Sequence, residues 1–254
     1  MHQGDPWIQG LPFGPGVKLV KADRNGLCAL EKPAGILSHP NKGGDRRRSL
    51  FQLGFDPGEE AFICSSDGEG ESRRIWLLNR LDSATSGLIL VALDPDVAEE
   101  VRRAFRERQV TKVYQALVFG HARARQERWQ DRMGVKGGQG SVRAGSSGHL
   151  QAVTEMRRLR LLPGPPAMSL LELIPKTGRT HQLRYQGGRR RLPIVGDQTY
   201  GNFQANRDFA RRTGNKRLFL HAQSVQLDYP FRGRRQSFKA QSPLPPDFRA
   251  VVSR

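Results

Sequence analysis

Residues 79–87, Asn-Arg-Leu-Asp-Ser-Ala-Thr-Ser-Gly, place one guanidinium and one carboxylate in a short polar segment. Arg80 and Asp82 are two residues apart, and the segment lies between the apolar runs IWLL (75–78) and LILVA (88–92), which have the composition of strands. Asp, Ser and Gly also satisfy the backbone of an ordinary turn. A carboxylate beside a guanidinium equally suits nucleophilic or acid–base chemistry near an anionic substrate. Both interpretations stand at this point.

The charge of the chain indicates the kind of partner. Its 254 residues carry 42 Lys and Arg against 24 Asp and Glu, a net charge of +18. Such an excess destabilises a compact chain by self-repulsion, and a polyanionic partner is the usual reason to retain it. Basic residues gather at 46–48, 102–108, 157–160, 189–191 and 232–235. Nucleic acid is favoured over an acidic membrane surface, because no basic amphipathic helix stands out, and a solvated basic surface is the plainer alternative.

Several other chemistries are excluded by the motifs that the chain lacks. The two Cys and six His residues show no metal-ligand spacing. There is no nucleotide-binding glycine motif and no G-x-S-x-G nucleophile motif. No apolar run approaches the roughly 20 residues of a bilayer-spanning helix, and the N-terminus does not resemble a secretion signal, so we expect a cytoplasmic protein. Carboxylate and arginine chemistry beside a polyanion remains.

The elements that would position the loop are mostly strands. Residues 17–33 predict a hairpin around Asn25-Gly26, a pair typical of a type I′ turn. Residues 94–109 predict a helix capped by Asp94, and shorter helices are expected at 49–55 and 179–188. Residues 121–149 are rich in Gly, Arg and Ser and predict a long loop or a loose hairpin. Paired neighbouring strands with few crossover helices argue against a doubly wound parallel sheet.

The loop resembles the H-R-L-D-x-x-T-S-G motif of the RluA family of RNA pseudouridine synthases. Five further segments resemble family motifs in the same order: EKPAGILSHP (31–40), TKVYQALVFG (111–120), PKTGRTHQLR (175–184), LPIVGDQTYG (192–201) and RLFLHAQSV (217–225). The resemblance runs from about residue 17 to 248. It implies an α/β domain of the α+β type with the pseudouridine synthase fold, a mixed, mainly antiparallel central sheet flanked by helices and loops. We expect this single catalytic domain at 17–254, after an N-terminal extension at 1–16.

The resemblance also implies an isomerase that needs no cofactor and no metal. The N1–C1′ bond of uridine is broken and the base is rejoined through C5, without exchange of electrons or groups. Asp82 is implied as the essential carboxylate, and Arg184 as the guanidinium that keeps it charged and oriented. Tyr114 is implied to stack on the target base and to accept the C5 proton. Arg80 is implied to fill the place of the extruded uridine, as an enzyme acting on a stacked base requires.

Other residues of these motifs have less definite roles. Arg179 and His181 either contact RNA phosphate or brace their loop, and the sequence does not decide between the two. Lys32 and His39 are interpreted as structural rather than catalytic. The Gly-Asp pair at 196–197 and Tyr200 are interpreted as loop scaffolding.

The chain departs from the family pattern in ways that affect function. Asn79 replaces the family His, and an amide cannot titrate; activity should survive if Asp82 carries the catalysis. The catalytic segment starts almost at once, which leaves no room for an S4-type RNA-binding domain. We therefore expect a monomer that recognises ribosomal or transfer RNA through its own basic loops. The alternative is a noncatalytic RNA-binding or ribosome-assembly protein on the same scaffold. Glycoside hydrolysis fits poorly, because the loop has one acid where hydrolases use two.

Overall fold

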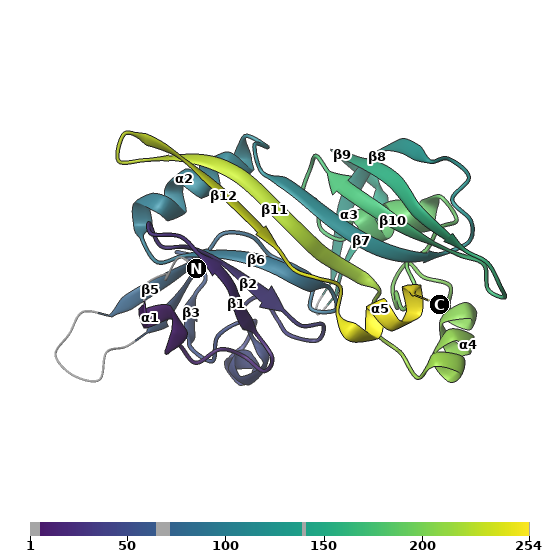
Figure 1. Cartoon of the computed structure of the whole chain (residues 1–254), viewed down its shortest axis with the longest axis horizontal. Helices are drawn as coiled ribbons and strands as arrows, with labels where there is room; N and C mark the ends of the chain where they lie inside the picture. Colours follow the sequence, from purple (N-terminus) through teal and green to yellow (C-terminus); the bar gives the residue numbers. More distant parts are fainter. Residues whose placement is uncertain (1–5, 65–71, 139–140, 254) are drawn as a thin grey trace. The chain divides into compact units, whose positions relative to one another are not determined.

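The computed structural model describes residues 6–64, 72–138 and 141–253, and the chain divides into two compact units (Figure 1). The first unit comprises Met1–Val110 and Ser224–Ser242, and the second comprises Thr111–Gln223 and Pro243–Arg254. In the described ranges, no helix combines the length and the apolar content needed to cross a membrane.

The first unit is built on antiparallel strand pairs. β1 pairs with β2, β2 with β6, β6 with β5, β5 with β4, and β4 with β3, while β11 and β12 form a hairpin. β11 crosses the boundary between the units along the chain. The elements are α1 (Pro6–Gln9), β1 (Lys18–Ala22), β2 (Leu27–Lys32), the 3-10 helix η1 (Gly43–Arg48), β3 (Gly54–Asp56), β4 (Ala61–Cys64), β5 (Arg73–Leu77), β6 (Ser86–Ala92), α2 (Pro95–Arg106), β11 (Leu220–Phe231) and β12 (Arg234–Gln241).

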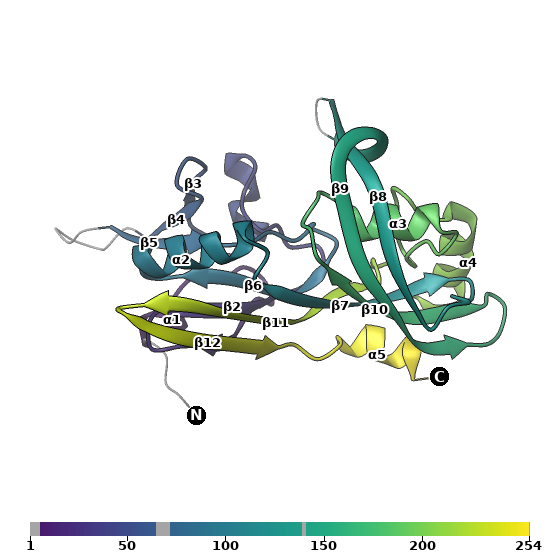
Figure 2. The same ribbon diagram turned by 90° about the horizontal axis from the view of Figure 1, so that it is seen from above.

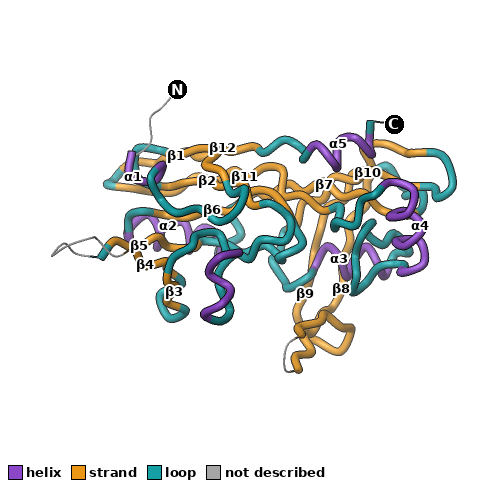
Figure 3. Tube along the Cα trace, turned by 90° about the horizontal axis from the view of Figure 1, so that it is seen from below, coloured by secondary structure: helices purple, strands orange, loops and turns teal. Residues whose placement is uncertain are grey.

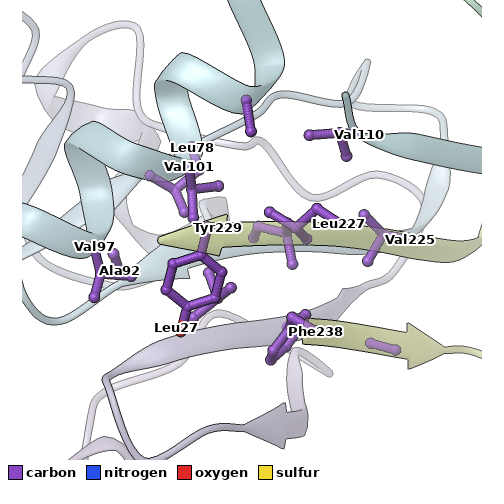
Figure 4. Packing of buried hydrophobic residues seen from close by; sticks show 14 of the residues in the cluster. Leu27, Leu78, Ala92, Val97, Val101, Val110, Val225, Leu227, Tyr229 and Phe238 are labelled. Carbon is purple, nitrogen blue, oxygen red and sulfur yellow. The ribbon is translucent and has the colours of Figure 1, made fainter. Parts of the chain in front are cut away.

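Helix α2 covers the main hydrophobic core of the first unit. The side chain of Asp94 accepts hydrogen bonds from the backbone N–H groups of Asp96 and Val97, so it caps the helix as predicted. Val97 and Val101 are fully buried against strand residues that include Tyr229 (Figure 4). Each such side chain stabilises the unit by about 1.5–3 kcal/mol. The predicted helix is confirmed, although it ends at Arg106.

Two local predictions in the first unit are wrong in detail. The hairpin of β1 and β2 is confirmed, but its loop has four residues, and only Gly26 among them has a positive φ, so the turn is not type I′. The Asp23 carboxylate explains the difference, since it accepts from the N–H groups of Asn25 and Leu27. The helix expected at 49–55 is absent, because Ser49 and Phe51 form backbone bridges to distant residues and η1 precedes them instead.

The second unit holds antiparallel strands in the order β7, β10, β9, β8. Its core contains Leu117, Phe209, Phe219 and Phe248, and helix α5 contributes the last of these. The elements are β7 (Thr111–Phe119), β8 (Gln126–Gly138), β9 (Ser141–Leu162), β10 (Met168–Pro175), α3 (Gln182–Arg189), α4 (Phe203–Thr213) and α5 (Pro246–Val252).

The segment predicted as a long loop or a loose hairpin is a long hairpin of β8 and β9 (Figure 2). Its pairing changes register between Met133 and Gly134, where the partner shifts from Leu150 to Gly145. Of the two predicted alternatives, a long loop and a loose hairpin, the structure has the hairpin. Its register change and its many glycines weaken the strand pairing.

The predicted α+β fold with a mainly antiparallel sheet flanked by helices and loops is confirmed. The strand pairs described above are antiparallel, and an isolated bridge between Leu37 and Ser49 is parallel. The predicted division into an N-terminal extension at 1–16 and one catalytic domain at 17–254 stays a prediction. Phe13, within that extension, stacks on Phe51 with ring centroids 5.3 Å apart.

Candidate active site

The Arg80–Asp82 loop connects β5 to β6 in the first unit, and the segment after β2 holds its backbone. The buried ammonium of Lys32 donates to the carbonyl oxygens of Pro33, Ile36 and Ser83, at 3.0, 2.7 and 3.1 Å. The N–H of Gly35, a residue with φ of +91°, also donates to the Ser83 carbonyl at 2.7 Å. These contacts support the structural interpretation of Lys32, because three carbonyls satisfy its charge.

Ser38 holds the same loop at the residue between Arg80 and Asp82. Its buried hydroxyl donates to the carbonyl of Leu81 at 2.8 Å and accepts from the N–H of Leu81 at 3.1 Å. Leu81 itself is buried. The backbone around the two charged residues is therefore fixed from both sides.

Asn79 has a definite role in the same loop. Its side-chain oxygen accepts a hydrogen bond from the backbone N–H of Leu90 on β6, at 2.7 Å. A neutral imidazole could provide the same acceptor. The position that departs from the family motif thus braces the loop through a hydrogen bond that needs no titrating group.

The fixed loop presents Arg80 to solvent. Its side chain is 63% exposed and lies 3.7 Å from the carboxylate of Glu60, which is 48% exposed. Ion pairs this exposed contribute little, so the guanidinium can exchange this partner for another at small cost. Asp82 is half-buried, and its carbonyl accepts from the N–H of Thr85 at 3.0 Å, closing a turn.

In the second unit, Arg184 lies on α3 and is 7% exposed. Its Nε and one Nη donate to the two carboxylate oxygens of Asp197, at 2.8 and 2.9 Å, and that Nη also reaches the Thr199 hydroxyl at 3.0 Å. Burial alone would raise the pKa of Asp197, but the Arg184 hydrogen bonds and charge, with backbone N–H donors, hold the pKa below its ordinary value. Asp197 is ionised at neutral pH and fixes the plane of the guanidinium.

The loop around Asp197 is built to hold that carboxylate. The N–H groups of Thr199 and Tyr200 donate to one carboxylate oxygen, at 2.7 and 3.0 Å. The Asn206 amide donates to the Asp197 carbonyl at 2.9 Å and accepts from the N–H of Gly196 at 2.8 Å. The pair Gly196-Asp197 has a structural role, as predicted, and the side chain that it holds in place is that of Arg184.

His181 and Arg179 precede α3. His181 adopts a left-handed φ of 56°, and its Nδ1 lies 3.1 Å from the hydroxyl of Tyr200. The Arg184 guanidinium stacks over the Tyr200 ring, 5.5 Å from its centroid. These contacts support the bracing role for His181. Arg179 is half-buried, and among the described residues its guanidinium makes one long contact, 3.5 Å from its Nε to the Gln151 carbonyl. A phosphate-binding role for Arg179 therefore stays a prediction.

Tyr114 lies on β7 opposite Leu173 of β10. Lys112 is two residues before it, so the two side chains share a face of the sheet. Burial lowers the pKa of the Lys112 ammonium below its ordinary value, and its Nζ is close to Gly178 in the loop before α3. Lys112 was not among the predicted site residues, although its K-x-Y spacing within the family motif was the available signal.

The basic cluster at 189–191 does not act as one surface. The guanidinium of Arg190 donates to Asp131 of β8 at 2.8 Å and lies 5.0 Å from the centroid of the Trp129 ring. Gln186 of α3 donates to the same carboxylate at 2.8 Å. Arg190 therefore holds α3 against the base of the β8–β9 hairpin. Arg189 is exposed but also lies 3.5 Å from the Asp131 carboxylate and donates to the Tyr185 hydroxyl at 3.2 Å, and Arg191 is exposed.

The predicted site residues thus fall into two groups. The second unit brings Arg184 and His181 together around Tyr200 and also carries Tyr114 on β7, and the first unit carries Arg80 and Asp82. The predicted pairing of Asp82 with Arg184 joins the two units and stays a prediction. Within the described ranges, no group of three or more His, Cys, Asp or Glu side chains is arranged to hold a metal ion.

Two solved human structures have a similar fold. RNA pseudouridylate synthase domain containing 1 matches with a TM-score of 0.66, at 24% identity over 94% of this chain and 90% of that chain. RNA pseudouridylate synthase domain containing 4 matches with a TM-score of 0.64, at 22% identity over 92% of this chain and 91% of that chain. At these identities the likeness shows the fold.

Sequence comparisons show the family. The model of the RNA pseudouridylate synthase family matches residues 26–186. The tRNA pseudouridine synthase C of Yersinia pestis is 32% identical over 222 residues, covering 82% of this chain and 79% of that protein. The dual-specificity RNA pseudouridine synthase RluA of Haemophilus influenzae is 30% identical over 240 residues, covering 91% and 95%. This chain therefore belongs to the RNA pseudouridylate synthases, and within them to the RluA family that its motifs predict.

Proposed function

We propose that this protein converts uridine to pseudouridine in transfer or ribosomal RNA, with Asp82 as the catalytic carboxylate. The observation that carries the assignment to Asp82 is the fixed loop. Lys32, Gly35 and Ser38 hold the backbone on both sides of this residue, while its own side chain stays half-buried. Preorganisation of this kind suits a group that must act at one atom of a bound nucleotide. The names of the relatives, tRNA pseudouridine synthase C and dual-specificity RluA, support transfer RNA as the first substrate to test.

The proposed reaction needs one ionised carboxylate and a route for one proton. The N1–C1′ bond breaks, a C5–C1′ bond forms, and the proton on C5 is replaced by one on N1, so the atoms balance without a co-reactant. Asp82 acts as nucleophile or base, which requires its charged form. Tyr114 stacks on the base and accepts the C5 proton. Arg184, already oriented by Asp197, is the proposed cation beside Asp82.

Arg80 is the proposed substitute for the extruded base. An enzyme that acts on a stacked base must remove it from the stack, and a planar group that occupies the vacated place favours the open state. The exposure of Arg80 and its weak pairing with Glu60 leave the guanidinium able to enter RNA. Its planar shape can stack on the neighbouring bases.

The noncatalytic alternative rested on Asn79 as a sign of lost activity. The hydrogen bond from Leu90 to Asn79 gives that residue a structural task. A residue with that task can change between Asn and His without loss of the catalytic carboxylate. The contact therefore favours the enzyme over the noncatalytic alternative.

The decisive experiment compares wild type with Asp82→Asn on unmodified transfer RNA transcripts, with Asp96→Asn as control. Asp96 is an exposed carboxylate in the first turn of α2 in the same unit. We expect Asp82→Asn to form no pseudouridine and to bind RNA within a few-fold of wild type, and Asp96→Asn to behave as wild type in both assays. Turnover by Asp82→Asn near the wild-type rate would remove Asp82 from the mechanism.

The RNA itself can be identified by mapping pseudouridines across total RNA from cells with and without the gene. We expect sites in transfer or ribosomal RNA that disappear without the gene and return when wild type, but not Asp82→Asn, is supplied. A cytoplasmic monomer is proposed as the working form. Sedimentation of the purified protein with and without transcript checks the monomer.

A further inference from the structure

A series of contacting aromatic rings connects the core of the first unit to its surface. Phe13 stacks on Phe51, Phe51 meets Phe62 edge to face, and Phe62 meets Phe55 in the same way. Phe51 and Phe62 are fully buried, whereas Phe55 is half-buried. The last ring is His39, which lies nearly parallel to Phe55 with centroids 4.7 Å apart and an interplanar angle of 12°. The buried rings therefore hold the outer pair in a fixed orientation.

His39 is fixed further by its own backbone neighbour. Its Nδ1 lies 3.2 Å from the carbonyl of Pro40, and a carbonyl can only accept, so Nδ1 carries the proton. In the neutral ring, Nε2 is then an acceptor. The His39–Phe55 pair thus offers half-buried aromatic surface with a hydrogen-bonding edge, and no step of the proposed reaction uses it.

Three exposed arginines lie on the short helix η1. The arginine turn, Arg46, Arg47 and Arg48 of η1, is tied to the segment that carries His39. The N–H of Leu37 donates to the Arg48 carbonyl at 2.8 Å, and the buried Asp45 carboxylate accepts from the N–H of Asn41 at 3.3 Å. In Figures 2 and 3 the short, unlabelled helix of this turn lies beside β3, which carries Phe55.

Most arginines of the arginine turn form no ion pair in the described ranges. Arg48 pairs with Asp45 at 3.2 Å. Arg46 and Arg47 form no ion pair with any residue in the described ranges. Two exposed guanidiniums that form no ion pair in the described ranges, on a turn hydrogen-bonded to the segment that carries His39, have with the aromatic rings the composition of a single-stranded nucleic acid site. In such a site bases stack on rings and phosphates meet cations.

The position of this surface relates it to the proposed catalytic loop. Ser38, which precedes His39, holds Leu81, which precedes Asp82. Summing bond lengths along this connection places the Cα atoms of His39 and Asp82 within about 13 Å of each other. That span covers a few nucleotides of a single strand.

We propose that His39, Phe55 and the arginine turn form a second RNA contact, which stacks the base of a nucleotide flanking the target uridine and binds its phosphate. The proposal rests on the proposed function for the identity of the RNA. It assigns His39 to binding, where the sequence indicated a structural role. It also gives the 46–48 cluster a specific task that distinguishes it from the other basic clusters.

Photocrosslinking and affinity measurements test the surface on the intact protein. The probes are an unmodified transfer RNA transcript and an oligouridylate that contains 5-iodouridine. We expect crosslinks at His39 or Phe55 in the wild type. His39→Leu should weaken transcript binding about 5- to 100-fold, the range for loss of one base stack, and should lower kcat/KM by the same factor. His39→Tyr, which keeps an aromatic ring, should restore most of the affinity.

The arginine turn is tested by salt dependence. Arg46→Gln/Arg47→Gln should reduce the slope of log Kd against log salt by about two. Arg232→Gln/Arg234→Gln is the matched control, since it removes two exposed arginines from the β11–β12 turn of the same unit. The control should change the affinity less than the arginine-turn variant does. Equal effects would mean that the arginine turn contributes only through the overall positive charge of the protein, and would refute its proposed role.

The experiments distinguish an incorrect assignment of this RNA contact from an incorrect assignment of the enzymatic activity. If the wild type isomerises RNA but His39→Leu binds as tightly as the wild type and crosslinks map elsewhere, the surface is refuted and the function stands. If the wild type crosslinks at His39 or Phe55 and isomerises no RNA, the surface is supported and the function fails. Equal unfolding midpoints of His39→Leu and wild type establish that folding is not the cause.

Discussion

Replacing Asp197 with Asn should destabilise the second unit and remove the support of Arg184. In the wild type the Asp197 side chain is fully buried and that of Arg184 is 9% exposed, and two hydrogen bonds of 2.8 and 2.9 Å join them. Asn cannot neutralise the guanidinium. The substitution therefore leaves a buried cation without its nearest counter-charge, which is more costly than losing an exposed pair.

The expected loss of unfolding free energy in Asp197→Asn follows from the contacts that are lost and those that are kept. Removing one partner of a buried pair costs about 3–5 kcal/mol of unfolding free energy. The Asn oxygen can still accept from the N–H groups of Thr199 and Tyr200, which meet a single oxygen of Asp197. We therefore expect the lower part of that range, about 3 kcal/mol at pH 7.

The pH dependence has a definite sign. The folded pKa of Asp197 is below its ordinary value of 3.8, so the pair stabilises the fold fully above that value. Its contribution is lost as the pH falls through the folded pKa. The difference between the wild type and Asp197→Asn should be constant at neutral pH and should shrink below about pH 4.

Urea denaturation followed by Trp129 fluorescence measures the effect. Trp129 is fully buried in the second unit, and Trp7→Phe/Trp76→Phe leaves it as the single reporter. With a slope of about 1–3 kcal/mol/M, the midpoint should fall by about 1–3 M. Asp208→Asn is the control, since Asp208 is a more exposed carboxylate of α4 whose pKa Arg211 also lowers, and its midpoint should not change. Equal midpoints for Asp197→Asn and the wild type would refute the reasoning.

Four further variants test the first unit. Asn79→Ala should lower the unfolding free energy by about 1–3 kcal/mol, since the Leu90 N–H loses its acceptor, and urea denaturation measures this. Asn79→His should keep turnover within about tenfold of the wild type at pH 8 but lose stability as the pH falls below about 6.5, because an imidazolium cannot accept. Arg80→Ala should slow single turnover at saturating RNA more than it weakens affinity, and an unchanged saturating rate would make Arg80 an ordinary phosphate contact. Lys32→Met should cost about 2–4 kcal/mol, because the carbonyls of Pro33 and Ile36 lose the ammonium donor, while that of Ser83 keeps the N–H of Gly35.

Much of the fold follows from local signals in the sequence. The α2 helix carries its own cap at Asp94 and an apolar face, so both its start and its buried side could be predicted. The hairpin at 17–33 could be predicted from two alternating runs, but its turn type could not. The Asp23 carboxylate accepts two backbone hydrogen bonds and selects a wider loop than the Asn-Gly pair alone favours. Residues 49–55 have helical composition, yet backbone bridges from Ser49 and Phe51 to distant segments override it.

Site residues could be predicted where they belong to a sequence motif. Contacts that depend on how the chain packs could be predicted less well. Arg80 and Asp82 stand together in one loop, so their types and spacing were visible directly. The partner of Arg184 was not, because Asp197 is thirteen residues further on and is brought to α3 only by the folded loop. Burial gives Lys112 its lowered pKa, and a sequence does not state which lysine will be buried. The contacts of Arg189 and Arg190 with Asp131 could not be predicted for the same reason, since they form only in the folded unit.

Arg184 and Arg80 show how one residue type performs two opposite tasks in this chain. Arg184 is buried, bidentate to Asp197 and stacked over Tyr200, so its guanidinium has one orientation and is suited to act on a fixed neighbour. Arg80 is 63% exposed and paired only weakly with Glu60, so it can change partner when RNA binds. Under the proposed mechanism, exchanging the two environments would abolish both roles, because a mobile Arg184 could not hold a carboxylate charged and a fixed Arg80 could not enter the stack. The hydrogen bonds between the side chains of Lys32 and Ser38 and the backbone of the loop reconcile these demands, because they fix the loop while the side chain of Arg80 remains in solvent.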